Sequence, residues 1–300
     1  MINLTRPLAR QVRAVFRHAL GVSPRGPFPA VSLRADQHGL TIRSKSGMAA
    51  IERSVPGEYP ADEVLVPGEL LVDCEGRSDQ VVSIERQADG DLIATWQDTN
   101  VPVMMRYSPP DAAELGDFPA PPESMVDNPA SLLTALRDAS ETAEPASIRF
   151  ALDHLELCGD SGTISATDSR QVLVRCGRSP TEPPPPTEGL QETRETLRSS
   201  VSAGSETRAE RFPWQGKVLV PRSTLYGNKE LQPTAVSIAK TEDWLAIRIG
   251  PWLYQVKLGQ ELLSAAGGGR KEREGLAGPI LAHKTLAPAG QAGAGAGPRS

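Results

Sequence analysis

The chain opens with a segment in which apolar residues recur every three or four positions, the spacing of a helix with one buried face. Thr5 is a suitable N-cap, and Gly21 follows the expected end of the helix. The sequence therefore predicts a helix over residues 5–20. Its predicted apolar face consists of Leu8, Val12, Val15, Phe16 and Ala19.

Alternation of apolar and polar positions follows this helix and predicts a series of short strands. A short second helix is expected at residues 69–74. The expected strands of this first half are residues 30–35, 39–43, 48–55, 64–66, 81–86, 91–97 and 101–107.

The same order then begins again with a helix over residues 129–143, whose apolar face contains Leu132, Leu133, Leu136 and Ala139. Strands are expected at residues 147–157, 163–166, 171–176, 218–220, 235–239, 244–249 and 252–258. The tetrapeptide Val-Leu-Val-Pro occurs at 64–67 and again at 218–221, in the later part of each helix-first unit. This repeat indicates an internal duplication.

These patterns predict an α+β protein with two repeated domains, each made of helices and antiparallel strands. The first domain is expected to span residues 1–108 and the second 129–262. The Pro-rich, acidic segment 109–128 between them is expected to be a connector. Residues 178–211 and 263–300 contain too few apolar residues to bury a core, which predicts a disordered insertion and a disordered tail.

The charge distribution suggests one local anion-binding surface. The chain carries a net charge of −5, which excludes a protein that binds nucleic acid through a high overall positive charge. Residues 1–35, however, contain six arginines and no acidic residue. Arg6, Arg10, Arg13 and Arg17 are spaced four, three and four apart, which places them in one row along the first helix.

No pattern typical of catalysis or of a metal site is present, so no cofactor is expected. The three cysteines show no C-x-x-C spacing and are expected to be reduced thiols. Asp153 and His154 are adjacent, and alternation along a strand predicts that they point to opposite faces. Neither a membrane span nor a secretory signal is evident, so a cytoplasmic location is expected.

Several segments resemble the bacterial DNA polymerase III beta subunit, the beta sliding clamp. They occur in the order that they have in that family. The segments are Asp117-Phe118-Pro119, Arg149-Phe150-Ala151-Leu152, Ala166-Thr167-Asp168-Ser169-Arg170, Val218-Leu219-Val220-Pro221-Arg222 and Gly250-Pro251-Trp252-Leu253-Tyr254. The resemblance covers roughly residues 1–258 and corresponds to the first and central domains of the family.

The resemblance implies a DNA clamp fold in a ring of similar domains, with helices toward DNA and sheets outside. It implies a processivity factor that encircles duplex DNA and tethers a polymerase, without a catalytic site of its own. The partners would be double-stranded DNA, DNA polymerase, clamp loader subunits and further copies of this chain, since three copies of two domains each would complete a six-domain ring as a trimer. The expected DNA-binding residues are Arg6, Arg10, Arg13, Arg17, Arg25 and Phe150. The expected partner cleft contains Leu152, Thr167, Val172, Pro221 and Leu225.

The second predicted helix departs from this pattern, because its polar side carries Arg137, Asp138 and Glu141 rather than a basic row. An alternative is therefore a clamp-derived interaction module that does not encircle DNA. A third hypothesis, an enzyme on an unrelated α+β fold, has no residue pattern in its favour.

Overall fold

A computed structural model describes residues 1–23, 25–145, 152–175, 212–231 and 235–259. These residues belong to one compact unit, Met1–Glu261. The predicted disordered segments, 178–211 and 263–300, lie outside the described residues, as does Phe150.

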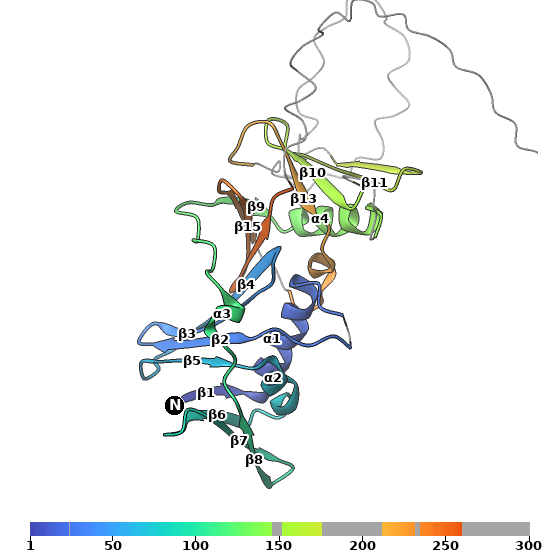
Figure 1. Ribbon diagram of the computed structural model, residues 1–300. Helices are drawn as coiled ribbons and strands as arrows, with labels where there is room; N and C mark the ends of the chain where they lie inside the picture. The colour runs from blue at the N-terminus through green and yellow to red at the C-terminus, as the bar shows by residue number, and fades with distance from the viewer. Residues whose placement is uncertain (24, 146–151, 176–211, 232–234, 260–300) are drawn as a thin grey trace, which may run out of the picture. The chain divides into compact units, whose positions relative to one another are not determined.

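The two halves of the chain run through the same order of elements: strand, helix, four strands, helix, three strands (Figure 1). In the first half these are β1 (Ile2–Thr5), α1 (Arg6–Ala19), β2 (Val31–Asp36), β3 (Gly39–Lys45), β4 (Ala49–Pro56), β5 (Asp62–Val66), α2 (Gly68–Cys74), β6 (Val81–Arg86), β7 (Leu92–Asp98) and β8 (Val101–Tyr107). In the second half they are β9 (Val126–Pro129), α4 (Ser131–Thr142), β10 (His154–Cys158), β11 (Thr163–Thr167), β12 (Val172–Arg175), β13 (Lys217–Pro221), η1 (Thr224–Gly227), β14 (Ala235–Lys240), β15 (Trp244–Ile249) and β16 (Trp252–Lys257).

Sheet pairing repeats as well. In the first half the strands pair in the orders β5-β2-β3-β4 and β1-β6-β7-β8. In the second half the matching orders are β13-β10-β11-β12 and β9-β14-β15-β16. The two Val-Leu-Val-Pro segments lie in or at the end of β5 and β13, which hold the same place in the two sheets. The predicted fold of two repeated helix-plus-antiparallel-sheet units is confirmed.

The two halves are joined by one continuous sheet. Strand β4 of the first half pairs with β16 of the second, which makes an eight-stranded antiparallel sheet. The register runs from Trp252 opposite Arg53 to Val256 opposite Ala49. The Arg53 guanidinium lies 4.6 Å from the centre of the Trp252 ring, and Phe16 of α1 meets the same ring edge-on. Main-chain bonding and side-chain packing therefore both cross between the halves.

The first helix forms as its pattern predicts. The Thr5 hydroxyl accepts a hydrogen bond from the Leu8 amide at the helix start, and Gly21 follows the end with φ of 64°. Leu8 is partly buried against the core. The remaining members of the predicted apolar face, Val12, Val15, Phe16 and Ala19, are all buried.

The predicted connector is partly ordered by contacts with the long sheet. It contains a short helix, α3 (Ala112–Leu115), and β9 begins inside its expected bounds. Arg43 of β3 lies over the Phe118 ring, with its guanidinium carbon 4.5 Å from the ring centre. The Gln255 side-chain amide donates to the Ala120 carbonyl at 3.1 Å. The connector thus covers the sheet face that is turned away from α1.

The residues that follow the segment that is not described, 212–216, pack closely against the second half of the chain. Phe212 and Trp214 stack with ring centres 4.9 Å apart, and both contact the core. Gly159 lies in the turn between β10 and β11, and its amide donates to the Gly216 carbonyl at 2.7 Å. A Cβ atom on Gly159 would stand only 1.9 Å from the Trp214 carbonyl oxygen, so no larger residue fits without a backbone shift.

We predict that Gly159→Ala lowers the free energy of unfolding by about 1–3 kcal/mol, because the added methyl group forces the two backbones apart. Urea unfolding followed by circular dichroism measures the change. Gly47→Ala is the matched control, because a Cβ there meets no atom within 4 Å. Equal stability of the two variants would contradict the close approach at Trp214.

Candidate nucleic-acid interface

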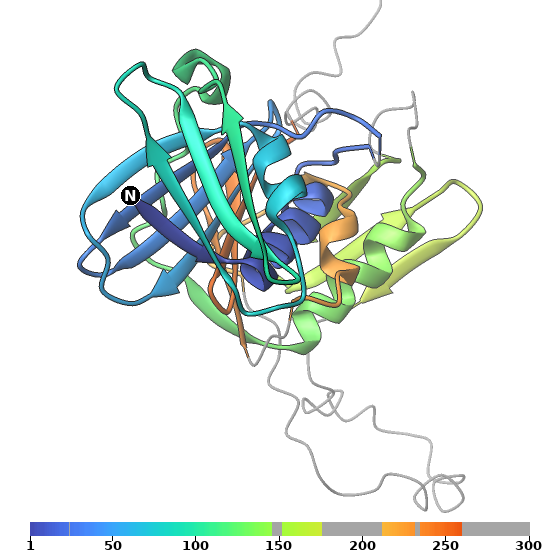
Figure 2. The same ribbon diagram turned by 90° about the horizontal axis from the view of Figure 1, so that it is seen from below.

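Helices of both halves lie together on one side of the strands. Helix α1 contacts α2 and η1, and η1 also contacts α4, so the four elements follow one another across the junction of the two halves. Figure 2 shows α2, α1, η1 and α4 following one another in a diagonal row. This helical surface is where the predicted row of arginines is found.

Arg6, the first residue of the predicted row, is buried with only 8% of its surface exposed. Its guanidinium donates to the Cys74 and Glu75 carbonyls, which end helix α2, at 3.2 and 3.1 Å. It also donates to the Gln97 carbonyl and to the Asp98 carboxylate, at 3.1 and 2.9 Å. Arg6 therefore joins α1, α2 and β7 inside the protein, and its expected place on a DNA-facing row is corrected.

The next arginines are only partly available. Arg13 is half-buried, and its Nε donates to the Glu75 carboxylate at 2.6 Å. Arg17 is also half-buried, and its Nε is shielded from solvent. Part of each guanidinium group therefore faces the protein rather than solvent.

Arg10 and Arg25 are the exposed members of the predicted set. Arg10 lies on the solvent side of α1, and Arg25 lies in the loop that leads from α1 to β2. Arg34, which adds to the positive charge of residues 1–35, lies on β2 between the inward-facing residues Leu33 and Ala35, so it projects from the opposite sheet face. The basic N-terminal segment is thus divided between two faces.

Acidic residues reduce the positive charge on the rest of the helical surface. Helix α2 exposes Glu69 and Asp73. On α4, Arg137 donates to Asp138 at 2.8 Å, and the hydrogen bond raises the pKa of Arg137. Among the predicted DNA-binding residues that the structure describes, exposed positive charge therefore lies on α1 and in the loop after it.

His18 links α1 to the second half. Its Nδ1 lies 2.9 Å from the Thr224 hydroxyl of η1. Partial burial, and then the nearby charge of Arg17, lowers the pKa of His18 below its usual value. Both effects disfavour the charged form of the imidazole.

The residues expected in a partner cleft separate into two groups. Thr167 and Val172 face each other across β11 and β12 and line a cavity of about 190 Å³, together with His154, Glu156, Ser165, Ala166 and Leu219. Pro221 pairs with His154 beside this cavity. Leu225 belongs to η1 and is buried, and Leu152 lies in the turn before β10, where its carbonyl accepts from the Glu144 amide. Neither Leu225 nor Leu152 lines the cavity.

The predicted separation of Asp153 and His154 is wrong. His154 Nδ1 lies 2.6 Å from the Asp153 carboxylate. Strand alternation does not apply to this pair, because β10 begins at His154 and Asp153 stands in the preceding turn.

The described part of the chain contains no group of three or more His, Cys, Asp or Glu side chains placed to hold a metal ion. None of its helices is long and apolar enough to span a membrane. Cys74 is buried, which raises the pKa of its thiol to about 12.

Known proteins resemble this chain in structure rather than in sequence. No protein-family model matches it, and no curated protein matches it. The DNA polymerase III subunit beta from Pseudomonas aeruginosa matches with a TM-score of 0.58 and 16% identity, over 86% of this chain and 64% of that one. The beta chain from Streptococcus pneumoniae matches with a TM-score of 0.61 and 12% identity, over the same shares of the two chains.

A sliding clamp from Pseudomonas aeruginosa bound to griselimycin matches over 90% of this chain and 68% of that one, with a TM-score of 0.60 and 17% identity. The chain spans 64% of the length of the first of these subunits. It has the fold of the DNA sliding clamps, and the predicted resemblance to the beta subunit is confirmed at the level of the fold.

We predict that Arg6→Leu lowers the free energy of unfolding by about 2–3 kcal/mol, because it leaves the carbonyls at the end of α2 without their donor. Chemical denaturation measures the loss. Arg10→Leu, on the exposed side of the same helix, should change stability by less than about 0.5 kcal/mol. If the two variants are equally stable, the structural role of Arg6 is refuted.

Proposed function

We propose that this chain is a clamp-like protein that holds duplex DNA against its helical surface without reading base sequence. The observation that carries the proposal is the pair of exposed arginines, Arg10 and Arg25, on the helical side of a sliding-clamp fold. Arginine is always charged and donates to phosphate oxygens through several N–H groups. Contacts of this kind position a protein on DNA and carry no sequence information.

Retention on DNA would come chiefly from encirclement. The net charge of −5 and the ion pairs on α4 leave little attraction for phosphates over most of the surface. A ring needs only weak contacts, because it leaves DNA by opening rather than by breaking them. If the ring contains six domains, three copies of this chain complete it under rotational symmetry.

The chain would act as an accessory subunit and perform no bond chemistry itself. A polymerase or a clamp loader subunit would dock on the outer side of the second half, where Thr167 and Val172 line the 190 Å³ cavity. Arg13 and Arg17 would contribute diffuse positive charge near the DNA. The part of Phe150 in DNA binding also stays a proposal.

A second candidate is an interaction module that does not encircle DNA. It is favoured by the charges on α4, where Arg137 is held by Asp138 and Asp138 also accepts from Arg175 at 3.3 Å. A helix whose basic groups are neutralised in this way is poorly suited to face phosphates. In this case the outer cavity would remain the partner site, and DNA affinity would be negligible.

The test is the salt dependence of DNA binding by the full chain. We predict measurable affinity for duplex DNA at low salt that falls as salt rises, equally for unrelated sequences. Arg10→Ala and Arg25→Ala should each lower the slope of log K against log salt by about 0.9. Fluorescence anisotropy with a labelled duplex measures both quantities.

Arg34→Ala is the matched control, because Arg34 is also exposed but lies on the opposite face of its sheet. It should leave the slope unchanged. DNA binding that is unaffected by Arg10→Ala and Arg25→Ala would contradict the proposed interface. Absence of DNA binding in the unaltered chain at low salt would favour the interaction module.

A further inference from the structure

The short helix η1 is tied to the exposed side of α1 at both of its ends. At its start, the Thr224 hydroxyl lies 2.9 Å from Nδ1 of His18. Just after its end, the Asn228 side-chain amide donates to the Ala14 carbonyl at 3.3 Å. Ala14 follows Arg10 by four residues, so the two lie in one row along α1. The second half of the chain therefore meets the arginine row at this point.

The turn after η1 has a fixed shape. The Asn228 amide donates to the Leu225 carbonyl at 2.9 Å, and the Leu231 amide donates to the Asn228 carbonyl at 3.1 Å. The Asn228 side chain also accepts from the Glu230 amide at 2.9 Å. Leu225 and Leu231 are buried and anchor the two ends of the turn. Lys229 and Glu230 are exposed at its tip, directly after the residue that is bonded to α1.

Lys229 differs from the cations around α4 because it has no acidic partner. Arg137 and Arg175 are both held by Asp138, at 2.8 and 3.3 Å. In the described part of the chain, no carboxylate forms an ion pair with Lys229. An unpaired lysine presents its ammonium group to a phosphate as a compact point charge.

We propose that Lys229 binds a phosphate of the DNA backbone and is the contact that the second half makes with the duplex in place of α4. The inference rests on the proposed DNA function and names the residue that extends it across the junction. The bond of Asn228 to Ala14 places Lys229 beside the arginine row, so one duplex can meet both halves at once. An ammonium group on a phosphate adds affinity without any preference for base sequence.

Glu230 acts against this contact. It is exposed next to Lys229 on the same turn, and no described cation forms an ion pair with it. Neighbouring residues lie well within the distance over which charges interact in dilute salt. A carboxylate at this place repels the phosphate that Lys229 attracts. The two charges of the turn therefore have opposite effects on DNA affinity, provided that the turn faces the DNA.

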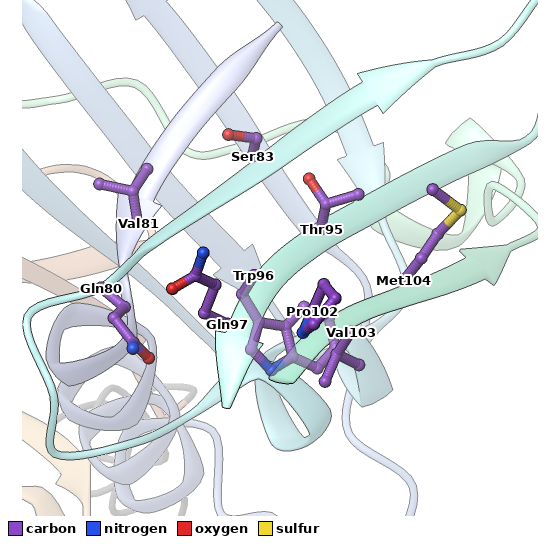
Figure 3. A pocket seen from close by; sticks show the side chains of 9 residues that line it. All are labelled: Gln80, Val81, Ser83, Thr95, Trp96, Gln97, Pro102, Val103 and Met104. Atoms are coloured by element: carbon purple, nitrogen blue, oxygen red, sulfur yellow. The ribbon is translucent and has the colours of Figure 1, made fainter. Parts of the chain in front are cut away.

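The outer face of the first sheet provides a contrasting surface. Ser83 and Thr95 stand side by side across β6 and β7, as Figure 3 shows. A cavity of about 630 Å³ opens over them, and none of the residues that line it is charged. Ala94 and Trp96 are buried, so Thr95 between them points out of the core. A label attached at Thr95 has room in this cavity and lies away from the helical surface.

Single charge changes in the full chain test the contact. Lys229→Gln should lower the affinity for duplex DNA about tenfold at about 50 mM salt and should lower the slope of log K against log salt by about 0.9. Glu230→Gln should raise the affinity about twofold under the same conditions. Fluorescence anisotropy with a labelled duplex measures these changes.

Lys257→Gln is the matched control for Lys229→Gln. Lys257 is exposed and lies two residues after Gln255, on the sheet face that the connector covers. Its replacement removes the same charge from the chain and should leave both affinity and slope unchanged. A loss of affinity as large as that of Lys229→Gln would show an effect of net charge and would overturn the contact.

A photocrosslinking label tests the position of the turn independently of its charge. In the full chain with Cys158→Ser and Cys176→Ser, a benzophenone maleimide is attached at Lys229→Cys or, as the control, at Thr95→Cys. Cys74 is buried and stays in place. With DNA in saturating excess, we expect cross-linking from the label at Lys229→Cys and none above background from the label at Thr95→Cys. Equal cross-linking from the two positions would overturn the contact.

These outcomes are separate from those of the DNA test. Affinity that is unchanged by Lys229→Gln and Glu230→Gln, in a chain that loses affinity through Arg10→Ala, would refute this contact alone. Absence of DNA binding by the unaltered chain would refute the proposed function and this contact with it.

Discussion

The antiparallel pairing of β4 with β16 is the interaction on which the rest of the structure depends. It turns two small sheets into one of eight strands and fixes the first half of the chain against the second. Because that sheet is continuous, α1 can reach η1, and the contact of His18 with Thr224 can form. Within the described residues, β8 and β12 each pair with a single strand and end their sheets.

Electrostatics limits what the helical surface can do. Arg6 stabilises the end of α2, Arg13 is held by Glu75, and the arginine on α4 is held by Asp138. Only Arg10 and Arg25 of the predicted set are exposed. Positive charge this sparse would give only weak, salt-sensitive attraction to DNA. Under the proposed function, retention on DNA would therefore depend on a closed ring.

Most of the fold could be predicted from the sequence where burial has a clear period. Helix α1 and strands β6 and β7 match their predicted ranges closely, because apolar residues there follow the helical or strand spacing. Strand β9 could not be predicted, because the four residues Val126–Pro129 contain too few apolar positions to show a period. Single-turn η1 is equally short, and its place is set by contacts with α1 and α4.

The candidate site was harder to predict, because its residues depend on neighbours distant in the chain. The spacing of Arg6 with Arg10 and Arg13 indicates a row, but the burial of Arg6 follows from the end of α2 and from Asp98. Leu225 was assigned to a cleft from resemblance alone, whereas α4 and α1 cover it in the fold. The free edges are invisible in sequence, because a period of two does not reveal whether a strand has one neighbour or two.

The most direct test of the central claim is the mass of the unaltered chain in solution, measured by light scattering over a wide range of protein concentration. A six-domain ring predicts a particle of about three times the 32.0 kDa chain mass that dissociates on dilution. A monomer at every concentration would contradict the ring, and a mass that grows without limit would show an open filament instead.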